Sequence, residues 1–420
     1  MCQFLNLESD DAYPIVSGEI YNKNIFITGQ PGSGKTYLTC LVIDGIKMYE
    51  DDNDHVYGRD FLTVTASTGI AAKLIDGKTI HSWSGLNYFK EDLEQDEYLK
   101  QIEDIKNNKY IVNKIKKTKI LVIDEVSLLS AKFIEILDLL LRKIKNSDKY
   151  FGNIKVMMIG DFYQLPPVKG KMAFESEIWD KIFDIQINLT SNHRTKDDKL
   201  INILSKIREN LPLDNIDNDL LKSKISKKII YPTLVSLRIQ AEKINKKEMD
   251  KLDTKIMEYN AIYNKEEYKK EILKYSPLED KLILKIGVPV IYLINNSSHK
   301  IYNGSVGTVV GFVNDNPKVK FGNTILEITK HTLRDIYNKN IIEMTQYPLL
   351  LAFAITIHRS QGQTLSQASI ILDSSIFENG QGYVALSRLQ SLDNLNLIKY
   401  NPLAFKSSSK VKEFYLKWDK

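Results

Sequence analysis

The sequence predicts an α/β protein with parallel β-sheets, organised as two domains of similar design. Short apolar runs alternate with longer helix-like segments in the first half, which is typical of a parallel sheet covered by helices on both faces. A second group of such runs follows late in the chain. A glycine-rich turn separates the first apolar run from the first helix, as in proteins that bind phosphate at a helix N-terminus.

Four buried strands are expected in the first half, each a short continuous apolar run bounded by polar or turn residues. They are NIFIT (24–28), FLTVT (61–65), KILVI (119–123) and KVMMI (155–159). The segments 36–49 and 131–144 are expected to form helices between these strands. The charged, amphipathic segment 86–118 predicts a small insert on this domain.

The second domain is expected to contain another set of strands. They are IQINL (185–189), LAFAITI (351–357), ASIILD (368–373) and LNLIKY (395–400). Residues 240–275, rich in Lys, Glu, Asn and Tyr, are interpreted as surface helices. The runs 285–294 and 304–313 combine β-branched residues with glycines and predict a small inserted β-barrel.

Composition limits the class of protein. At 420 residues the chain predicts two or three domains, and 43% hydrophobic with 26% charged residues indicates a globular fold. The longest apolar runs, such as 349–355, are far shorter than the ~20 residues of a membrane span. Cys2 and Cys40 provide no disulfide framework and fit a reducing compartment. With no apolar leader at the N-terminus, a soluble intracellular protein is expected. The net charge of +5 weakly favours polyanionic partners.

The stretch GQPGSGKT (29–36) fits the P-loop pattern and lies between a predicted strand and a helix. Its glycines allow backbone amides to turn toward phosphate oxygens, Lys35 reaches the terminal phosphates, and Thr36 is a ligand for Mg²⁺. The predicted nucleotide-binding residues are Gly29, Gly32, Ser33, Gly34, Lys35 and Thr36.

The stretch LVIDEVS (121–127) supplies an acidic pair at the end of a buried strand. Asp124 is expected to hold Mg²⁺, and Glu125 to orient or deprotonate the attacking water. In GDFYQLPPV (160–168), polar residues again follow an apolar strand. Gln164 is therefore predicted to contact the γ-phosphate or the attacking water and to sense whether that phosphate is present.

The chain as a whole resembles the PIF family of 5′-to-3′ DNA helicases of superfamily 1, branch B, with phage Dda and bacterial RecD helicases as more distant relatives. Eight segments carry this resemblance in the family's order. They are GQPGSGKT, TASTGIAAKLIDGKTIHSW (65–83), LVIDEVSLLS, FGNIKVMMIGDFYQLPPV (151–168), LTSNHR (189–194), YNGSVGTVVGF (302–312), AITIHRSQGQTL (354–365) and YVALSRLQSLDNL (383–395).

The resemblance implies a specific architecture. Two RecA-like P-loop domains are expected, 1A over 1–185 and 2A over 186–420. Domain 1A would carry the small insert 1B over about 79–118, and domain 2A an SH3-like β-barrel insert 2B over about 280–335.

The resemblance also implies further site residues. Arg194 and Arg388 match two arginines that reach the γ-phosphate from the second domain, so the catalytic set is Lys35, Asp124, Glu125, Gln164, Arg194 and Arg388. Gln361 and Gly362 are expected to turn toward the nucleotide. The expected DNA-binding residues are Thr65, Ser67, Thr68, Thr79, His81, Thr356, His358 and Ser360. For Trp83, stacking on a base and burial in the core are both open.

The implied activity is ATP-dependent 5′-to-3′ translocation on single-stranded DNA with unwinding of duplexes, in replication, repair, recombination or telomere maintenance. ATP and Mg²⁺ are the expected cofactors, and single-stranded DNA and DNA with a 5′ overhang the expected partners of a monomer that contacts no membrane. Two alternatives stay open: a translocase that acts on RNA, and a non-hydrolysing nucleic-acid clamp. The family's upstream adenine-reading glutamine motif has no match in residues 4–19, so selectivity for adenine is open too.

Overall fold

The computed structural model describes residues 22–52, 61–86, 94–294, 296–299, 301, 303–337 and 340–417. The upstream segment 4–19 therefore lies outside the described residues. The chain divides into two compact units. Among the described residues, unit 1 runs to Phe162 and resumes over Pro166–Arg194. Unit 2 consists of Tyr163–Leu165 and the chain from Thr195 onward.

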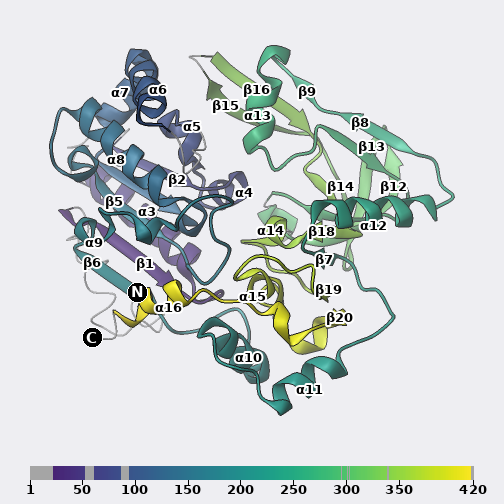
Figure 1. Ribbon diagram of the computed structural model, residues 1–420. Coiled ribbons are helices and arrows are strands. Elements are labelled where there is room, and N and C mark those ends of the chain that lie inside the picture. The colour runs from purple at the N-terminus through teal and green to yellow at the C-terminus, as the bar shows by residue number, and fades with distance from the viewer. Residues whose placement is uncertain are drawn as a thin grey trace. The chain divides into compact units, whose positions relative to one another are not determined.

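Unit 1 is built on a six-stranded sheet in the order β3-β2-β4-β5-β1-β6, with all neighbours parallel. Its strands are β1 (Ile25–Gly29), β2 (Leu62–Ala66), β3 (Lys78–Thr79), β4 (Ile120–Asp124), β5 (Lys155–Ile159) and β6 (Ile185–Leu189). Its helices are α3 (Lys35–Asp52), α4 (Gly69–Leu74), α5 (Ile80–Ser84), α6 (Gln95–Asn107), α7 (Lys109–Lys117), α8 (Ala131–Lys145) and α9 (Trp179–Ile182). The four strands expected in the first half are confirmed, each within one residue of the predicted start (Figure 1).

The core of unit 1 forms because the central strands are apolar on both faces. All five residues of β1 and of β4 are buried. Helix α3 packs its apolar side chains Leu38, Val42 and Ile46 into the cluster that contains Ile25 and Ile27. This burial fixes the start of α3 directly beyond the end of β1, which positions the glycine-rich turn.

The strand at 185–189 belongs to unit 1, so its expected place in the second domain is wrong. Strand β6 pairs with β1 over five residues, from Ile25 with Ile185 to Gly29 with Leu189. The compact unit accordingly extends to Arg194. Its position late in the sequence suggested that this strand belongs with the second group of strands. Strand pairing, however, is decided by which sheet edge is available in three dimensions.

Unit 2 contains a smaller parallel sheet in the order β18-β7-β19-β20. Its strands are β7 (Thr233–Val235), β18 (Ala354–Thr356), β19 (Ala368–Leu372) and β20 (Leu395–Tyr400). The helices of unit 2 are α10 (Asp198–Arg208), α11 (Asn215–Ser223), α12 (Arg238–Asp250), α13 (Lys269–Tyr275), α14 (Ile357–Ser360), α15 (Gln381–Leu386) and α16 (Ser409–Leu416). The expected strand 351–357 is thus shortened, because Ile357 already begins α14.

Antiparallel strands make up the rest of unit 2. They are β8 (Met257–Asn260), β9 (Ile262–Tyr263), β10 (Lys281–Leu284), β11 (Pro289–Tyr292), β12 (Val306–Val313), β13 (Asn316–Phe321), β14 (Thr324–Glu327), β15 (His331–Tyr337), β16 (Asn340–Gln346) and β17 (Leu349–Leu351). Five of them form the sheet β14-β13-β12-β11-β17. Strands β8 and β9 correct the prediction that 240–275 is helical throughout.

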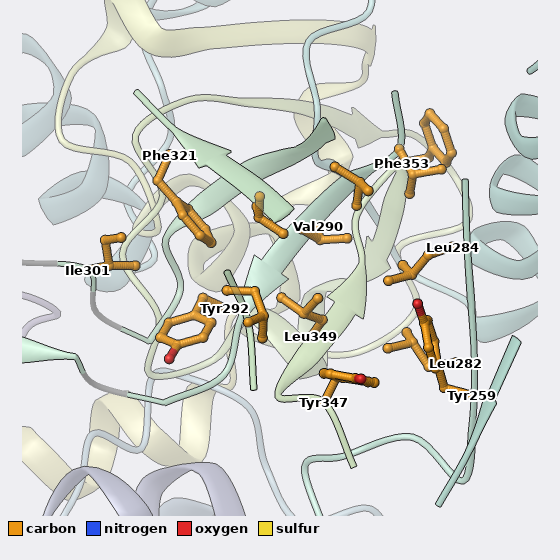
Figure 2. Packing of buried hydrophobic residues seen from close by; sticks show 14 residues of the cluster. Tyr259, Leu282, Leu284, Val290, Tyr292, Ile301, Phe321, Tyr347, Leu349 and Phe353 are labelled. Atoms are coloured by element: carbon orange, nitrogen blue, oxygen red, sulfur yellow. The ribbon is translucent and has the colours of Figure 1, made fainter. Parts of the chain in front are cut away.

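Strands β8, β10, β11, β12, β13 and β17 share one apolar core, seen close up in Figure 2. Tyr259 and Tyr347 pack edge to face with ring centroids 4.7 Å apart. Tyr292 packs on Phe321 in the same way at 5.7 Å. Among the residues that the structure describes, no helix has the length and apolar character needed to cross a membrane.

Candidate active site

The glycine-rich loop follows the carboxyl end of β1 and leads directly into α3. Gly32 and Gly34 have φ angles of +86° and +89°, a region that residues with a Cβ rarely adopt. The ammonium of Lys35 donates to the carbonyl oxygens of Gly29 at 2.6 Å and Gln30 at 3.1 Å, while the next residue, Thr36, is exposed. The loop thus has the backbone conformation and the positive charge that a polyphosphate requires.

The segment that follows β6 braces this loop from within unit 1. The His193 amide donates to Gly32 O at 2.7 Å, and the Asn192 side chain donates to Pro31 O at 3.3 Å. A Cβ added to Gly32 would lie 2.5 Å from the Cβ of Arg194. Arg194 therefore belongs to the same unit as the loop, and its expected approach from the second domain is wrong.

The acidic pair lies at the carboxyl end of β4. Asp124 is buried, and its Oδ1 accepts a hydrogen bond from the Glu125 amide at 2.8 Å. Burial is the main cause that raises the pKa of Asp124, and the neighbouring charge of Glu125 adds to it, whereas Lys35 opposes the shift. Glu125 has a φ of +54°, so the backbone turns sharply after the strand. A carboxylate in such a place is stabilised in its charged form by a cation.

Gln164 belongs to unit 2, although it follows the last residues of unit 1 by only two positions. It is 5% exposed, between Tyr163 and the fully buried Leu165. Its carbonyl lies close to Gly380, where an added Cβ would be 2.3 Å from Gln164 O. The glutamine is thus held through its backbone as well as through its neighbours.

Arg388 is fully buried in unit 2 and binds backbone there. Its Nε donates to Val384 O at 3.0 Å, and its Nη1 donates to Gln363 O at 3.2 Å and Ser360 O at 3.4 Å. The loop that Arg388 holds contains Gln361, which is 9% exposed, and Gly362, whose φ is +78°. The arginine thereby fixes the turn predicted to face the nucleotide.

Three of the predicted DNA-binding hydroxyls point into the protein. Thr65 Oγ1 donates to Val122 O at 2.6 Å, Ser67 Oγ to Glu125 O at 2.8 Å, and Ser360 Oγ to Ile357 O at 2.8 Å. All three side chains are buried. A direct side-chain contact of these residues with DNA is contradicted by this geometry, because each hydroxyl holds a neighbouring stretch of backbone.

The other predicted DNA-binding residues lie at helix starts. Thr68, Thr79 and Thr356 are the N-caps of α4, α5 and α14, and each hydroxyl accepts a backbone amide hydrogen bond. Thr68 and Thr356 are half-buried, whereas Thr79 is buried. A capping hydroxyl keeps its own O–H free to donate outward, which suits a phosphate contact at Thr68 and Thr356.

The two predicted aromatic candidates of unit 1 are in its core. His81 is 2% exposed and lies 4.8 Å from the ring of Phe133. Trp83 is 1% exposed, so core packing is the correct alternative for it. In unit 2, His358 is half-buried. Burial lowers the pKa of His358, while Glu378 opposes the shift.

Sequence reasoning missed the residues that hold Gln164 and the beginning of α10. Tyr163, adjacent to Gln164, stacks on Tyr415 at 5.0 Å. Asp197 accepts from Ser391 Oγ at 3.0 Å and from the Leu392 amide at 2.8 Å. The aromatic pair that precedes Gln164 could have indicated that Tyr163 has a packing role. Its stacking partner, Tyr415, could not be inferred, because it lies over 200 residues later in the sequence.

A glycine-rich loop between a parallel strand and a helix, with an acidic pair at the end of a neighbouring strand, defines a P-loop NTPase. The family model for PIF1-like helicases matches residues 5–210. The ATP-dependent DNA helicase Pif1 of Bdellovibrio bacteriovorus is 31% identical over 94% of this chain and 89% of its own length. The chain belongs to the PIF1-like helicase family.

Solved structures agree with this assignment. The crystal structure of Pif1 helicase from Candida albicans is similar with a TM-score of 0.79 and 29% identity, covering 98% of this chain and 99% of that one. Bacteroides Pif1 bound to ssDNA has a TM-score of 0.69 and 28% identity over 98% of this chain and 97% of that one. The chain spans only 65% of the curated Saccharomyces cerevisiae relative RRM3, to which it is 29% identical over 93% of its own length.

Proposed function

We propose that the protein is an ATP-dependent DNA helicase that moves 5′-to-3′ on single-stranded DNA and unwinds duplexes. The observation that carries this proposal is the set of functional side chains at strand ends of a parallel sheet, in a chain of the PIF1-like helicase family. Relatives named ATP-dependent DNA helicases and a relative bound to ssDNA support it. Such an activity would act in replication, repair, recombination or telomere maintenance.

The nucleotide site that we propose combines the loop with the acidic pair. Gly29, Gly32, Ser33, Gly34, Lys35 and Thr36 would hold the phosphates of ATP, with Gln361 and Gly362 contributing from unit 2. No group of three or more His, Cys, Asp or Glu side chains suited to a metal occurs among the described residues. From the P-loop pattern and the acidic pair, we propose that Thr36 and Asp124 hold Mg²⁺ together with phosphate oxygens, as is usual for this ion.

The proposed chemistry is attack of water on the γ-phosphate. Mg²⁺, when bound, neutralises charge on the β- and γ-phosphate oxygens. Glu125 would orient the water and accept its proton, and Lys35 would stabilise the charge that develops on the phosphates. Gln164, Arg194 and Arg388 would contact the γ-phosphate in the transition state.

For Arg388, this role needs a change of rotamer, because its guanidinium is now bound to backbone carbonyls.

The proposed DNA contacts are made to phosphates and sugars and read no sequence. Thr68, Thr356 and His358 are the predicted residues whose side chains are at least partly exposed. The buried residues of the predicted set would position the exposed ones indirectly, by holding neighbouring backbone or by filling the core. They are Thr65, Ser67, Thr79, His81 and Ser360. Single-stranded DNA and DNA with a 5′ overhang are the proposed partners, and the protein would act as an intracellular monomer.

The domain organisation that we propose follows the family. Unit 1 would correspond to domain 1A, with helices α6 and α7 as insert 1B within about 79–118. Unit 2 would correspond to domain 2A. Strands β11, β12, β13 and β14 of the five-stranded antiparallel sheet would be the core of an SH3-like insert 2B within about 280–335, and β17, which lies beyond these bounds in the sequence, pairs with β11 at one edge.

Among the alternatives, a non-hydrolysing clamp is disfavoured because Lys35, Asp124 and Glu125 are all present.

The test is ATP hydrolysis with and without single-stranded DNA, followed by unwinding of partial duplexes. We expect hydrolysis to rise with single-stranded DNA and much less with RNA of the same sequence. Equal stimulation by RNA would favour the RNA translocase, and no stimulation by either would contradict the proposal.

A further inference from the structure

Two adjacent residues, Phe162 and Tyr163, are anchored in different compact units. The Phe162 ring lies in an aromatic cluster of unit 1, with centroid distances of 5.6 Å to Phe26 and 5.5 Å to Trp179. Tyr163 begins the three-residue stretch that belongs to unit 2, and the chain re-enters unit 1 at Pro166. The backbone therefore crosses between the units on both sides of Gln164.

The unit 2 anchor is a cluster of three side chains, Tyr163, Tyr415 and Arg208. The Tyr163 ring stacks on Tyr415 of α16, with centroids 5.0 Å apart and an interplanar angle of 11°. The guanidinium carbon of Arg208, at the end of α10, lies 4.7 Å from the Tyr163 centroid and 5.3 Å from that of Tyr415. Stacking and cation–π contacts both favour this fixed arrangement. Only 8% of Tyr163 is exposed.

Helix α15 links the same stretch to Arg388. Its N-cap, Gly380, has a φ of +74° and approaches the backbone of Tyr163 and Gln164 so closely that an added Cβ would lie 2.6 and 2.3 Å from their carbonyl oxygens. Arg388 follows the other end of this six-residue helix and donates back to Val384 O within it. The Gln164 backbone thus lies against one end of this short helix, and Arg388 follows its other end.

We propose that Tyr163 is a positioning residue that fixes Gln164 to unit 2, so that Gln164 and Arg388 move together as one group. The proposal rests on the proposed function, in which both side chains contact the γ-phosphate in the transition state. Gln164 then reaches its catalytic position only when unit 2 does. Loosening the Tyr163 cluster lets Gln164 lose that position and leaves nucleotide binding by unit 1 intact.

The first experiment compares Tyr163→Ala with Tyr163→Phe in DNA-stimulated ATP hydrolysis. Tyr163→Ala removes both ring contacts, and we expect kcat to fall about tenfold or more while KM for ATP changes less than about twofold. Tyr163→Phe keeps the ring and should restore kcat to nearly the unmodified value. Arg208→Met, which removes the cation and keeps the chain length, provides a second route if Tyr163→Ala does not fold.

The matched control is Tyr259→Ala. Tyr259 is also 8% exposed and loses an aromatic partner, Tyr347, at a similar 4.7 Å, but it lies among the antiparallel strands of unit 2. We expect this variant to melt at a lower temperature while its DNA stimulation stays at the unmodified level. A fall in stimulation as large as that of Tyr163→Ala would reduce the effect to general destabilisation and overturn the proposal.

A double-mutant cycle with Gln164→Ala separates positioning from other effects. If Tyr163 acts through Gln164, the variant with both changes should hydrolyse ATP no more slowly than Gln164→Ala alone. Fold-losses that multiply, or full activity of Tyr163→Ala, would overturn the proposal. An unmodified protein without DNA-stimulated hydrolysis would instead overturn the proposed function, so the two failures are distinguishable.

Discussion

At the scale of single residues, Lys35 helps to fix the conformation of the glycine-rich loop. Its ammonium is held by the carbonyls of Gly29 and Gln30, so the charge is satisfied by oxygens of the loop itself. Phosphate oxygens of a nucleotide would replace these carbonyls as acceptors. The charge-assisted hydrogen bonds are exchanged rather than created, which keeps the loop conformation nearly unchanged on binding.

Two substitutions separate binding from chemistry at this site. Lys35→Ala removes the cation that spans the terminal phosphates, so hydrolysis and unwinding should be abolished. Glu125→Gln keeps the size of the side chain but loses the base, so nucleotide affinity should stay within about threefold while turnover falls about a hundredfold or more. Nucleotide binding by fluorescence and turnover by phosphate release check both. Unmodified turnover in Glu125→Gln would remove Glu125 from the role of base.

His358 predicts a dependence of stability on pH. Burial depresses the pKa of its imidazole below the ordinary value of 6.5, so the unfolded chain binds the proton more readily than the folded one. The folded state is therefore favoured above pH 6.5, and this advantage is lost as the pH falls below that value and through the folded pKa. Between pH 7.5 and 5.5, His358→Gln should lose less thermal stability than the unmodified protein. Equal losses in both proteins would contradict the shift.

At the scale of elements, the four central strands of the first sheet, β2, β4, β5 and β1, were predictable from sequence because they are short, continuous apolar runs. The edge strands β3 and β6 were not placed correctly. Strand β8, with the sequence MEYN, was not predictable, because only Tyr259 of its four residues is buried and no apolar run marks it. Strand β7 was missed for a different reason, because all three of its residues are buried but the strand is too short to stand out in the sequence. The P-loop was predictable because all its residues are adjacent in the chain.

The inward direction of the Thr65 hydroxyl was not predictable, since its acceptor, Val122 O, lies 57 positions away.

The start of α15 provides a test at this scale. Gly380→Ala places a Cβ against two carbonyl oxygens at a φ of +74°, so the stretch around Gln164 must move. We expect a loss of about 1–3 kcal/mol in the free energy of unfolding and reduced ATP turnover. Gly311→Ala is the control, because a Cβ there meets nothing within 4 Å. It should change stability by less than about 1 kcal/mol. Urea unfolding measures both, and equal effects would contradict the close approach at Gly380.

At the scale of the whole molecule, the proposed function has both α/β units contribute to one nucleotide site, and such units are expected to change their arrangement during each ATP cycle. Three chain crossings connect them among the described residues: before Tyr163, after Leu165 and after Arg194. Each crossing adjoins a residue proposed to contact the γ-phosphate. In the proposed function, loss of that phosphate would be communicated along the backbone at these crossings.

The proposed DNA contacts predict that movement is independent of sequence and sensitive to salt, while its polarity is what the family resemblance implies. We propose that Thr68 in unit 1 and Thr356 and His358 in unit 2 contact phosphates and sugars of the same DNA strand. Each ATP cycle would then move the contacts of one unit along the DNA, whatever its sequence. A partial duplex with a 5′ single-stranded tail should be unwound with ATP and Mg²⁺, and one with only a 3′ tail should not. Because phosphate contacts release counterions, raising the salt from about 50 to 200 mM should weaken binding at least about tenfold.

The control for polarity is the Glu125→Gln protein, which should bind both tailed substrates and unwind neither. Strand displacement from fluorescently labelled duplexes measures the outcome, and two tail sequences of equal length test the independence from sequence. The family supplies the direction of movement, which no residue spacing in the chain specifies. Efficient unwinding from the 3′ tail alone would therefore contradict the proposed direction, while leaving the nucleotide site and its residues in place.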